Sequence, residues 1–365
     1  MLYRVIGVMS GSSLDGLDLA FVELEESGGK WVFEIKAAQC MPYSHEWLSC
    51  LQGAAQLTAY DYLLLDTALG KYIGEKVNDF IEQFGLHHQV QLIASHGHTV
   101  FHAPYMGMTA QLGDGAAIAA ATEINVVSDL RALDVALGGQ GAPIVPLGEK
   151  LLLPQYDFFL NLGGIANLSH KGKNGYIAFD VCAANRVLNM LAATEGRMYD
   201  EDGDMAAAGH IHTPLLTQLN ALEYYAQEYP KSLANSFGTA TVYPLIQSFD
   251  ISTADKLCTY TNHIAMQTGY AAQNVMRGGE MTDSKIMVTG GGAHNKYLVG
   301  RIKNTLQPLQ IEVVVPEAML INYKESLIMA LLGVLRWREE NTVLQSVTGA
   351  TRSSIGGAVW IGQEA

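Results

Sequence analysis

The sequence predicts an α/β protein built from two similar halves. Its 365 residues exceed the size at which a single hydrophobic core keeps growing. Segments typical of strands and of helices alternate through both halves. Each half also opens with two apolar strands joined by a glycine-rich turn, at residues 11–16 and again at Gly163-Gly164. Two similar halves predict a ligand cleft between them.

The first half is expected to begin with strands at 2–9 and 19–24. Apolar residues then recur at helical spacing over 59–84, which predicts one long helix or two shorter ones. A buried strand at 90–95 is expected to end at His96, and an alanine-rich helix to end near Thr122. A short strand at 125–128 follows.

The second half repeats this plan. Strand, glycine turn and strand occupy 157–168, another strand covers 176–180, and a helix is expected over 185–194. A strand at 284–289 runs into three glycines and then a helix at 295–306. The glycine- and proline-containing connection 130–145 is the expected crossing between domains. We expect one domain at 1–133 plus 346–365 and the other at 134–345.

Composition limits the classes of partner. Net charge is −14, which argues against a nucleic acid or an anionic membrane as the main partner. The apolar start is too short for a signal peptide, and no stretch approaches the roughly 20 apolar residues that span a bilayer. Four scattered cysteines indicate reduced thiols, so a cytoplasmic location is expected.

The first glycine turn, within residues 9–18, has the composition of a phosphate-binding loop. Its glycines allow successive N–H groups to point at an anion, and its serines add hydroxyl donors. Asp15 and Asp18 are suited to a hydrated Mg²⁺. An ordinary polar hairpin turn is an equally good interpretation of this segment alone. The chain has no Gly-Lys-Ser/Thr, and the loop has no Gly-x-Gly-x-x-Gly pattern, so both common phosphate fingerprints are excluded.

Two further glycine clusters strengthen the phosphate interpretation. The turn at 161–167 corresponds to the first one, and Gly290-Gly291-Gly292 follows a strand where a ligand ring can lie against bare backbone. Each cluster alone is explained by turn chemistry. The ordered set of all three clusters, with the first two at corresponding positions of the two halves, favours a polyphosphate bound from both sides of a cleft.

Asp180 is the candidate catalytic acid because it closes an apolar strand, where a carboxylate projects into a cleft. The alternative is that Asp180 caps the helix beginning at Asn185. His96, His98 and His102 are an alternative transition-metal set, but their spacing lacks a nearby acid and disfavours it.

The chain closely resembles the anhydro-N-acetylmuramic acid kinases, from end to end. The segments that carry the likeness are residues 7–16, 95–100, 111–114, 134–143, 161–167, 290–295, 324–327 and 346–350. The resemblance implies the two-domain fold of actin-like ATPases, with a ribonuclease H-like duplication and an interdomain cleft. It also implies a kinase that uses ATP and Mg²⁺ to open 1,6-anhydro-N-acetylmuramic acid with water. Phosphorylation of O6 then gives N-acetylmuramic acid 6-phosphate, in the recycling of cell-wall sugars, and a homodimer is expected.

The resemblance also implies the site residues. The catalytic base is Asp180. The nucleotide-binding residues are Gly11, Ser12, Ser13, Leu14, Asp15, Gly16, Leu17, Asp18, Gly163, Gly164, Asn167, Gly290, Gly291 and Gly292. The sugar-binding residues are His96, Thr99, Arg131, Asn185 and Glu325.

The chain departs from the family pattern in two segments. After the base, the family has Thr-Gly-Pro-Gly-Asn where this chain has Val181-Cys182-Ala183-Ala184-Asn185. The family's Thr-Gly-Arg-Glu is replaced by Leu233-Ala234-Asn235-Ser236. Both changes lie where the sugar is expected. Two rival functions stay open: a kinase of the same superfamily acting on another sugar, and a nucleotide-switched, chaperone-like ATPase.

Overall fold

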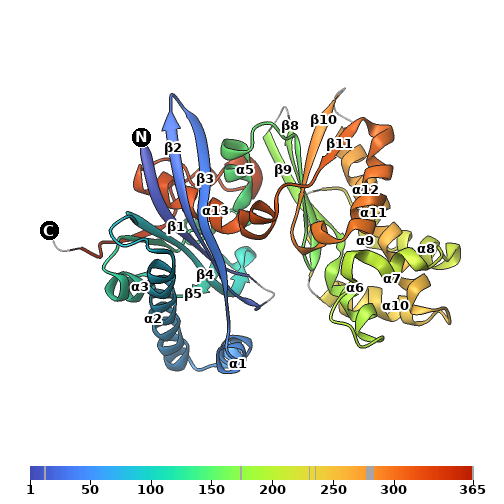
Figure 1. The fold of residues 1–365 in the computed structure, drawn as a ribbon, viewed down its shortest axis with the longest axis horizontal. Helices are drawn as coiled ribbons and strands as arrows, with labels where there is room; N and C mark the ends of the chain where they lie inside the picture. The colour runs from blue at the N-terminus through green and yellow to red at the C-terminus, as the bar shows by residue number, and fades with distance from the viewer. Residues whose placement is uncertain (12–13, 173–174, 230, 235, 277–282, 364–365) are drawn as a thin grey trace. The chain divides into compact units, whose positions relative to one another are not determined.

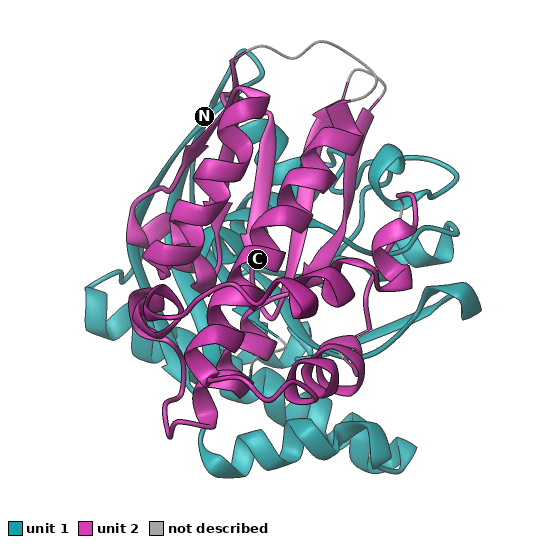
Figure 2. Cartoon of the chain, turned by 90° about the vertical axis from the view of Figure 1, so that its right-hand side faces the viewer, with its two compact units in different colours: residues 1–154, 323–365 teal, residues 155–322 magenta. Residues whose placement is uncertain are grey.

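The computed structural model describes residues 1–11, 14–172, 175–229, 231–234, 236–276 and 283–363. This part of the chain forms two compact units (Figure 2). Unit 1 comprises residues 1–154 and 323–365, and unit 2 comprises residues 155–322. The segment 130–145 lies inside unit 1. The domain boundaries expected after residues 133 and 345 stay a prediction.

The sheet of unit 1 has seven strands among the described residues, in the order β12-β6-β4-β1-β2-β3, with β5 paired to β4 (Figure 1). Strands β1, β2 and β3 are antiparallel neighbours, whereas β4 and β6 run parallel to β1 and to each other. The bounds are Leu2–Ser10 (β1), Gly16–Ser27 (β2), Lys30–Pro42 (β3), Leu92–Ala103 (β4), Met108–Leu112 (β5), Val126–Ser128 (β6) and Ala358–Trp360 (β12).

The sheet of unit 2 repeats this topology with five strands in the described part, in the order β11-β10-β7-β8-β9. Its first three strands are again antiparallel, and the next two again run parallel. The bounds are Phe158–Leu162 (β7), Ile165–Gly172 (β8), Gly175–Ala183 (β9), Ser284–Thr289 (β10) and Ile311–Val314 (β11). In both sheets the first four strands of the unit have the order third, second, first, fourth, and a further parallel strand follows, β6 in unit 1 and β11 in unit 2. This confirms the predicted α/β class and its ribonuclease H-like duplication.

The structure corrects three expectations about strands. The strand β3 was not anticipated, because charged and apolar residues mix along Lys30–Pro42 and only its pairing with β2 decides its conformation. The strand β4 does not end at His96 but continues to Ala103, since β5 pairs with its second half. Asp180 lies within β9, three residues before its last residue.

The helices follow local capping signals. For α2, Thr58 accepts a hydrogen bond from the Asp61 N–H at the start, and Gly85 adopts a left-handed conformation at the end, so residues 59–84 form one helix. The helices of unit 1 are His45–Gly53 (α1), Ala59–Phe84 (α2), Gly115–Thr122 (α3), Ala132–Ala136 (α4), Val145–Leu152 (α5) and Gln345–Thr348 (α14). Those of unit 2 are Asn185–Ala193 (α6), Asp204–Ala208 (α7), Thr213–Asn220 (α8), Glu223–Ala226 (α9), Tyr243–Gln247 (α10), Thr253–Met276 (α11) and Lys296–Leu306 (α12), and Ala318–Trp337 (α13) passes from unit 2 into unit 1.

The sheet of unit 1 is covered on both faces because neighbouring strand residues alternate. Ile93 packs in the same core as Ile73 and Val77 of α2. A Cβ on Gly333 of α13 would lie 2.5 Å from the Ala94 Cβ, so α13 lies against the other face. Gly7 is required there, because a side chain would collide with the backbone of Ser326.

One described helix, α13, is long and apolar enough by composition to cross a membrane, which corrects the expectation that no such stretch exists. Two-thirds of its apolar window is buried within the protein. It also contains the buried Lys324, whose Nζ lies 2.9 Å from the Glu149 Oε1 of α5. Its burial and its ion pair make α13 a core helix of the fold.

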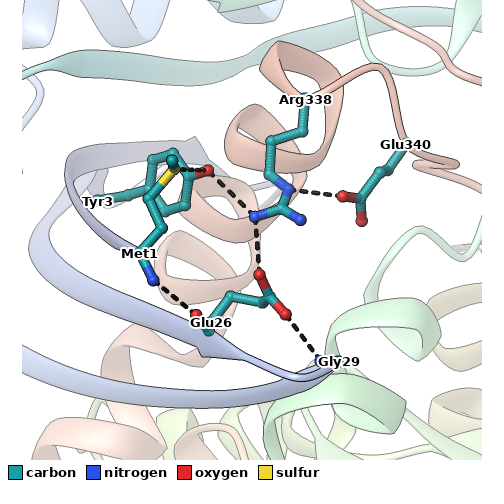
Figure 3. A network of polar contacts seen from close by, with 6 residues as sticks. All are labelled: Met1, Tyr3, Glu26, Gly29, Arg338 and Glu340. Carbon is teal, nitrogen blue, oxygen red and sulfur yellow. Dashed lines mark hydrogen bonds and ion pairs between the residues drawn. The ribbon is translucent and has the colours of Figure 1, made fainter.

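A polar network fixes the end of α13 to the far end of the first hairpin (Figure 3). Arg338, just after α13, donates to the Tyr3 hydroxyl and to Glu26 Oε2, both at 3.1 Å, and its Nε donates to Glu340. The other Glu26 oxygen accepts from the Gly29 N–H, and the N-terminal ammonium donates to the Glu26 carbonyl. These bonds stabilise unit 1 at the end of the hairpin opposite the glycine turn.

Candidate functional site

The first glycine turn joins β1 to β2 in unit 1. Leu14 has φ 60°, an uncommon conformation for a residue with a side chain, and its N–H donates to the Gly11 carbonyl at 3.3 Å. At the start of the turn, the Ser10 hydroxyl lies 2.8 Å from the Tyr43 hydroxyl and 3.0 Å from His98 Nδ1. Ser12 and Ser13 lie outside the described residues. The turn is therefore held at its base by side chains from two other segments.

Carboxylates gather beside this turn. The pKa of Asp18 on β2 is raised to about 6, mainly by burial and also by the charges of Asp15 and Glu325, although a hydrogen bond with Cys40 lowers it. Carboxylate oxygens are ligands that Mg²⁺ prefers, and this ion uses one or two carboxylates and keeps several waters. The donor set of Asp15 and Asp18 therefore fits such an ion. Within the described residues, no closed group of three or more metal-binding side chains occurs.

A second polar group of unit 1 contains three of the predicted sugar-binding residues. Arg131 donates its Nε–H to His96 Nε2 at 2.8 Å and an Nη1–H to the Gly141 carbonyl at 2.6 Å. The His96 proton therefore resides on Nδ1, which donates to the Gly97 carbonyl at 2.9 Å. Burial, with the Arg131 charge, lowers the pKa of His96 to about 3, so this imidazole is neutral.

Glu325 completes this group from α13. Burial raises the pKa of Glu325, whereas the charges of Lys324 and Arg131 lower it. Burial lowers the pKa of Arg131 to about 10, which still leaves it cationic at neutral pH. Thr99 lies further along β4, where its hydroxyl accepts from Gln111 Nε2 at 3.4 Å. The structure thus brings His96, Arg131 and Glu325 together and leaves Thr99 with other partners.

The histidines do not form a metal set. His98 Nδ1 lies against Ser10, and His102 Nδ1 lies 3.0 Å from the Thr109 hydroxyl. Since His96 uses both ring nitrogens on protein partners, these three side chains have separate roles. The described residues therefore give no support to the transition-metal set of histidines that their spacing already disfavoured.

Asp134 is a residue whose role the sequence analysis missed. Its buried carboxylate accepts from the Gly141 N–H and from the Thr348 hydroxyl, both at 2.8 Å. Gly141 in turn supplies the carbonyl that orients Arg131. Asp134 therefore positions Arg131 through the glycine loop. The feature of the sequence that could have indicated this role is the place of Asp134 beside the glycines of the motif 134–143.

The second glycine turn joins β7 to β8 in unit 2. The carbonyls of Gly163 and Gly164 accept from the N–H groups of Asn185 and Ala184, at 3.0 and 2.9 Å. In the described part of the chain, no acceptor partners the N–H groups of these two glycines. A pair of backbone N–H groups without a protein acceptor is suited to an anion.

The third glycine cluster lies against the second turn. A Cβ on Gly290 would come within 2.5 Å of Asn161 Oδ1, and a Cβ on Gly292 within 2.9 Å of Asn185 Oδ1. Asn185 itself donates from Nδ2 to the Leu162 carbonyl at 2.7 Å. The two predicted nucleotide clusters of unit 2 are thus neighbours, with Asn185 between them.

Arg186 is a second residue that the sequence analysis missed. A Cβ on Gly164 would lie 3.7 Å from Arg186 Nε, so the guanidinium borders the turn. No hydrogen bond or ion pair engages Arg186 among the described residues. A cation next to an anion-binding turn is suited to phosphate. The feature of the sequence that could have indicated this role is that Arg186 directly follows Asn185, a residue of the family motif.

Asp180 is held by the segment that follows α9. The Leu233 N–H donates to Asp180 Oδ2 at 2.8 Å, and the Asp180 N–H donates to the Lys231 carbonyl at 3.2 Å. Burial raises the pKa of Asp180, and the bond from Leu233 lowers it. Asp180 does not cap α6, because Ala184 occupies that position without a side-chain bond. Among the described residues, the other carboxylate oxygen has no hydrogen-bond partner, and such a half-buried carboxylate is a suitable proton acceptor.

Comparisons with known proteins give a family match over almost the whole chain. A family model described as anhydro-N-acetylmuramic acid kinase matches residues 3–362. Curated relatives with that name include proteins of Shewanella woodyi, 32% identical over 97% of this chain and 98% of the relative, and of Zymomonas mobilis, 34% identical over 84% and 86%. The relative from Coxiella burnetii is 31% identical over 99% of this chain and 98% of its own length.

Solved structures give a more distant likeness. The activator of 2-hydroxyisocaproyl-CoA dehydratase from Clostridium difficile, with bound ADPNP, is 14% identical, and the alignment covers 92% of this chain and 96% of the activator with a TM-score of 0.44. Hexokinase from Schistosoma mansoni, complexed with glucose, is 12% identical over 90% of this chain and 85% of the hexokinase, with a TM-score of 0.36. The family match rests on sequence over almost the whole length, and this chain therefore belongs to the anhydro-N-acetylmuramic acid kinase family.

Proposed function

We propose that Asp180 is the general base with which this kinase activates water to open 1,6-anhydro-N-acetylmuramic acid. Membership of the family makes the chain a phosphotransferase with an alcohol group as acceptor. The reaction consumes ATP and gives N-acetylmuramic acid 6-phosphate, a step in recycling cell-wall sugars. The observation that carries the proposal is the Asp180 carboxylate, fixed through one oxygen by Leu233 and half-buried.

The chemistry requires a base at this point. Water attacks C1 as the C1–O6 bond breaks with oxocarbenium character, and a carboxylate takes the proton of that water. The freed O6 then attacks the γ-phosphoryl in line, with ADP as the leaving group. Burial raises the pKa of Asp180, and a carboxylate with a raised pKa accepts a proton more readily.

Sugar binding is assigned to Arg131, Glu325, His96 and Thr99 of unit 1 and to Asn185 of unit 2. A half-buried cation beside a half-buried carboxylate is suited to hold polar groups of a sugar in one orientation. His96 supports this arrangement by fixing Arg131, and Asp134 supports it through Gly141.

Nucleotide binding is assigned to Gly11 to Asp18 in unit 1 and to Gly163, Gly164, Asn167 and Gly290 to Gly292 in unit 2. Free N–H groups at Gly163 and Gly164, with Arg186 beside them, favour a phosphate group at that turn. Asp15 and Asp18 are the residues that would hold Mg²⁺, which neutralises phosphate charge when bound.

The variant Asp180→Asn tests the base. It keeps the size of the side chain and removes the proton acceptor, so we expect turnover to fall by about 10³-fold. Isothermal titration should find binding of the anhydro sugar and of an ATP analogue close to wild type. Turnover near that of the wild type would refute the role, and loss of binding would show a structural effect instead.

The identity of the sugar is tested by a substrate panel. We expect phosphorylation of 1,6-anhydro-N-acetylmuramic acid with release of ADP, and no comparable turnover of N-acetylmuramic acid or N-acetylglucosamine, which have no anhydro bond. Preference for one of the latter would favour another sugar kinase of the superfamily. A homodimer and a cytoplasmic location belong to the same proposal and rest on the family resemblance.

A further inference from the structure

Unit 2 contains a cavity that the kinase chemistry does not use. Its volume is about 390 Å³, and its walls come from β9, from residues 225–229 with Lys231, and from α11. The α11 residues Gln267, Tyr270, Ala271 and Asn274 follow one another at helical spacing, so one face of the helix forms a wall. The volume is at the small end of the range for ligand pockets, about 300–1,000 Å³.

The cavity lies behind the catalytic strand. Phe179 and Val181 of β9 line it. Val181 lies at a register shift, but Phe179 and Asp180 pair regularly with Leu168 and Asn167, so their side chains point to opposite faces. The Asp180 side chain therefore points away from the wall that Phe179 forms. This separates the cavity from the site assigned to the reaction.

Gln267 places a hydrogen-bond acceptor in the wall. It is only 6% exposed, and its Nε2 donates to Asn220 Oδ1 at 2.9 Å. Its Oε1 has no partner among the described residues, although it is not sealed from solvent. A deeply buried amide whose carbonyl faces a cavity without a partner points to a ligand that donates a hydrogen bond.

Buried hydrogen bonds through Asn220 and His263 fix the Gln267 amide and the Tyr225 hydroxyl. Asn220 Oδ1 also accepts a hydrogen bond from His263 Nδ1–H at 2.7 Å, so His263 Nε2 accepts a hydrogen bond from the Tyr225 hydroxyl at 3.0 Å. The Tyr225 oxygen, which belongs to a residue of the wall, is thereby left with acceptor capacity. His263 is fully buried and neutral, since burial lowers its pKa to about 3.

Aromatic rings supply the other recognition element. Phe179 and Tyr229 stack with ring centroids 5.3 Å apart and planes 13° apart, and Tyr270 is 48% exposed at the same cavity. The two charged residues of the wall, Glu228 and Lys231, have opposite signs, and Lys231 is engaged by the Tyr224 carbonyl at 3.2 Å. Fixed acceptors, flat apolar rings and no net charge fit a neutral ring that carries several hydroxyl groups.

We infer that this cavity is a carbohydrate-binding site, distinct from the site of phosphoryl transfer, which takes a neutral monosaccharide. The hydroxyl groups of the sugar donate to Gln267 Oε1 and to the Tyr225 oxygen, and the C–H face of the ring packs on the aromatic side chains. The inference rests on unit 2 alone and does not depend on the role proposed for Asp180.

The test is binding of N-acetyl-D-glucosamine and of D-glucose, measured by saturation-transfer NMR on the full chain. We expect binding in the wild type and in Asp180→Asn, and at least a tenfold loss in Gln267→Leu and in Tyr270→Ala. The matched control is Gln273→Ala, an exposed α11 residue outside the wall, which should bind like the wild type.

Tyr270→Ala guards against misfolding, because it removes a half-exposed side chain and should leave the unfolding temperature near that of the wild type. Absence of binding to the wild type would overturn the inference. Binding that persists in both cavity variants, or that is lost in Asp180→Asn but not in them, would also overturn it.

Discussion

The same position in the two sheets holds different chemistry. In unit 1, Asp18 on the second strand pairs in register with Cys40 on the third. In unit 2, Asn167 on the second strand pairs with Asp180 on the third. Each pair lies next to the glycine turn that joins the first two strands. The two units share the order of these strands, but the carboxylate lies on the second strand in unit 1 and on the third strand in unit 2.

The surroundings of the two carboxylates explain the difference in role. Burial and the charges of Asp15 and Glu325 raise the pKa of Asp18 to about 6, an environment that favours a bound cation. Burial raises the pKa of Asp180, the Leu233 N–H donates to its Oδ2 and lowers that pKa, and its Oδ1 has no hydrogen-bond partner among the described residues. We therefore propose a cation ligand at this place in unit 1 and a base at the equivalent place in unit 2.

The strongest test of this comparison replaces the third-strand residue of each pair, Asp180 in unit 2 and Cys40 in unit 1. Asp180→Cys places in unit 2 the residue found at that place in unit 1, and we expect turnover to fall by about 10²- to 10⁴-fold. Cys40→Ser should change turnover by less than about threefold, because the pKa of Cys40 is raised to about 12 and its thiol stays protonated. Steady-state rates of ADP release measure both. Equal losses would contradict the assigned roles.

The two glycine turns differ in charge, because Asp15 and Asp18 lie at the first turn and Arg186 borders the second. Substitution of Arg186 tests this difference. Its removal in Arg186→Ala takes away a charge-assisted contact worth about 1.5–3 kcal/mol, so the KM for ATP should rise about 10- to 150-fold. The KM for the sugar should change little. Arg197→Ala, at an exposed arginine of unit 2, is the control, and Arg186→Lys should restore part of the affinity. An unchanged KM for ATP would remove Arg186 from the site.

The acidic turn of unit 1 is tested through its cation. Asp18→Asn removes one oxygen charge, and the Mg²⁺ concentration that gives half-maximal rate should rise about tenfold. Titration of the rate with MgCl₂ at saturating ATP and sugar measures this. Glu34→Gln, an exposed β3 carboxylate, is the control. A dependence on Mg²⁺ identical to that of the wild type would place the cation elsewhere.

The smallest effect concerns stability without ligands. The pKa of Asp18 is about 6 in the fold against an ordinary 3.8, so the native state binds more protons between these values. This contribution to the free energy of unfolding is present below about pH 4 and is lost as pH rises through about 6, by at most about 3 kcal/mol. Urea unfolding from pH 4 to 7 should show a smaller decline for Asp18→Asn than for the wild type. Identical slopes would show that Asp18 titrates normally.

Much of the fold was predictable because local signals agreed with the tertiary structure. The helix 59–84 has a threonine cap and a terminal glycine, and its range was predicted to the residue. The strand β3 was not predictable, since its mixed residues become a strand only by pairing with β2. Likewise, β4 continues past His96 because β5 pairs with it.

The sequence by itself determined the α/β class, the duplication, the family and the glycine turns, because these depend on periodicity, turn chemistry and motif order. Only the tertiary structure decided which side chains meet. It placed Leu233 on Asp180, Arg186 at the turn of Gly164 and Asp134 behind Arg131 through Gly141. These contacts join residues that are distant in the chain or lie on different elements, and their distances follow from sheet register and packing, which no local pattern records.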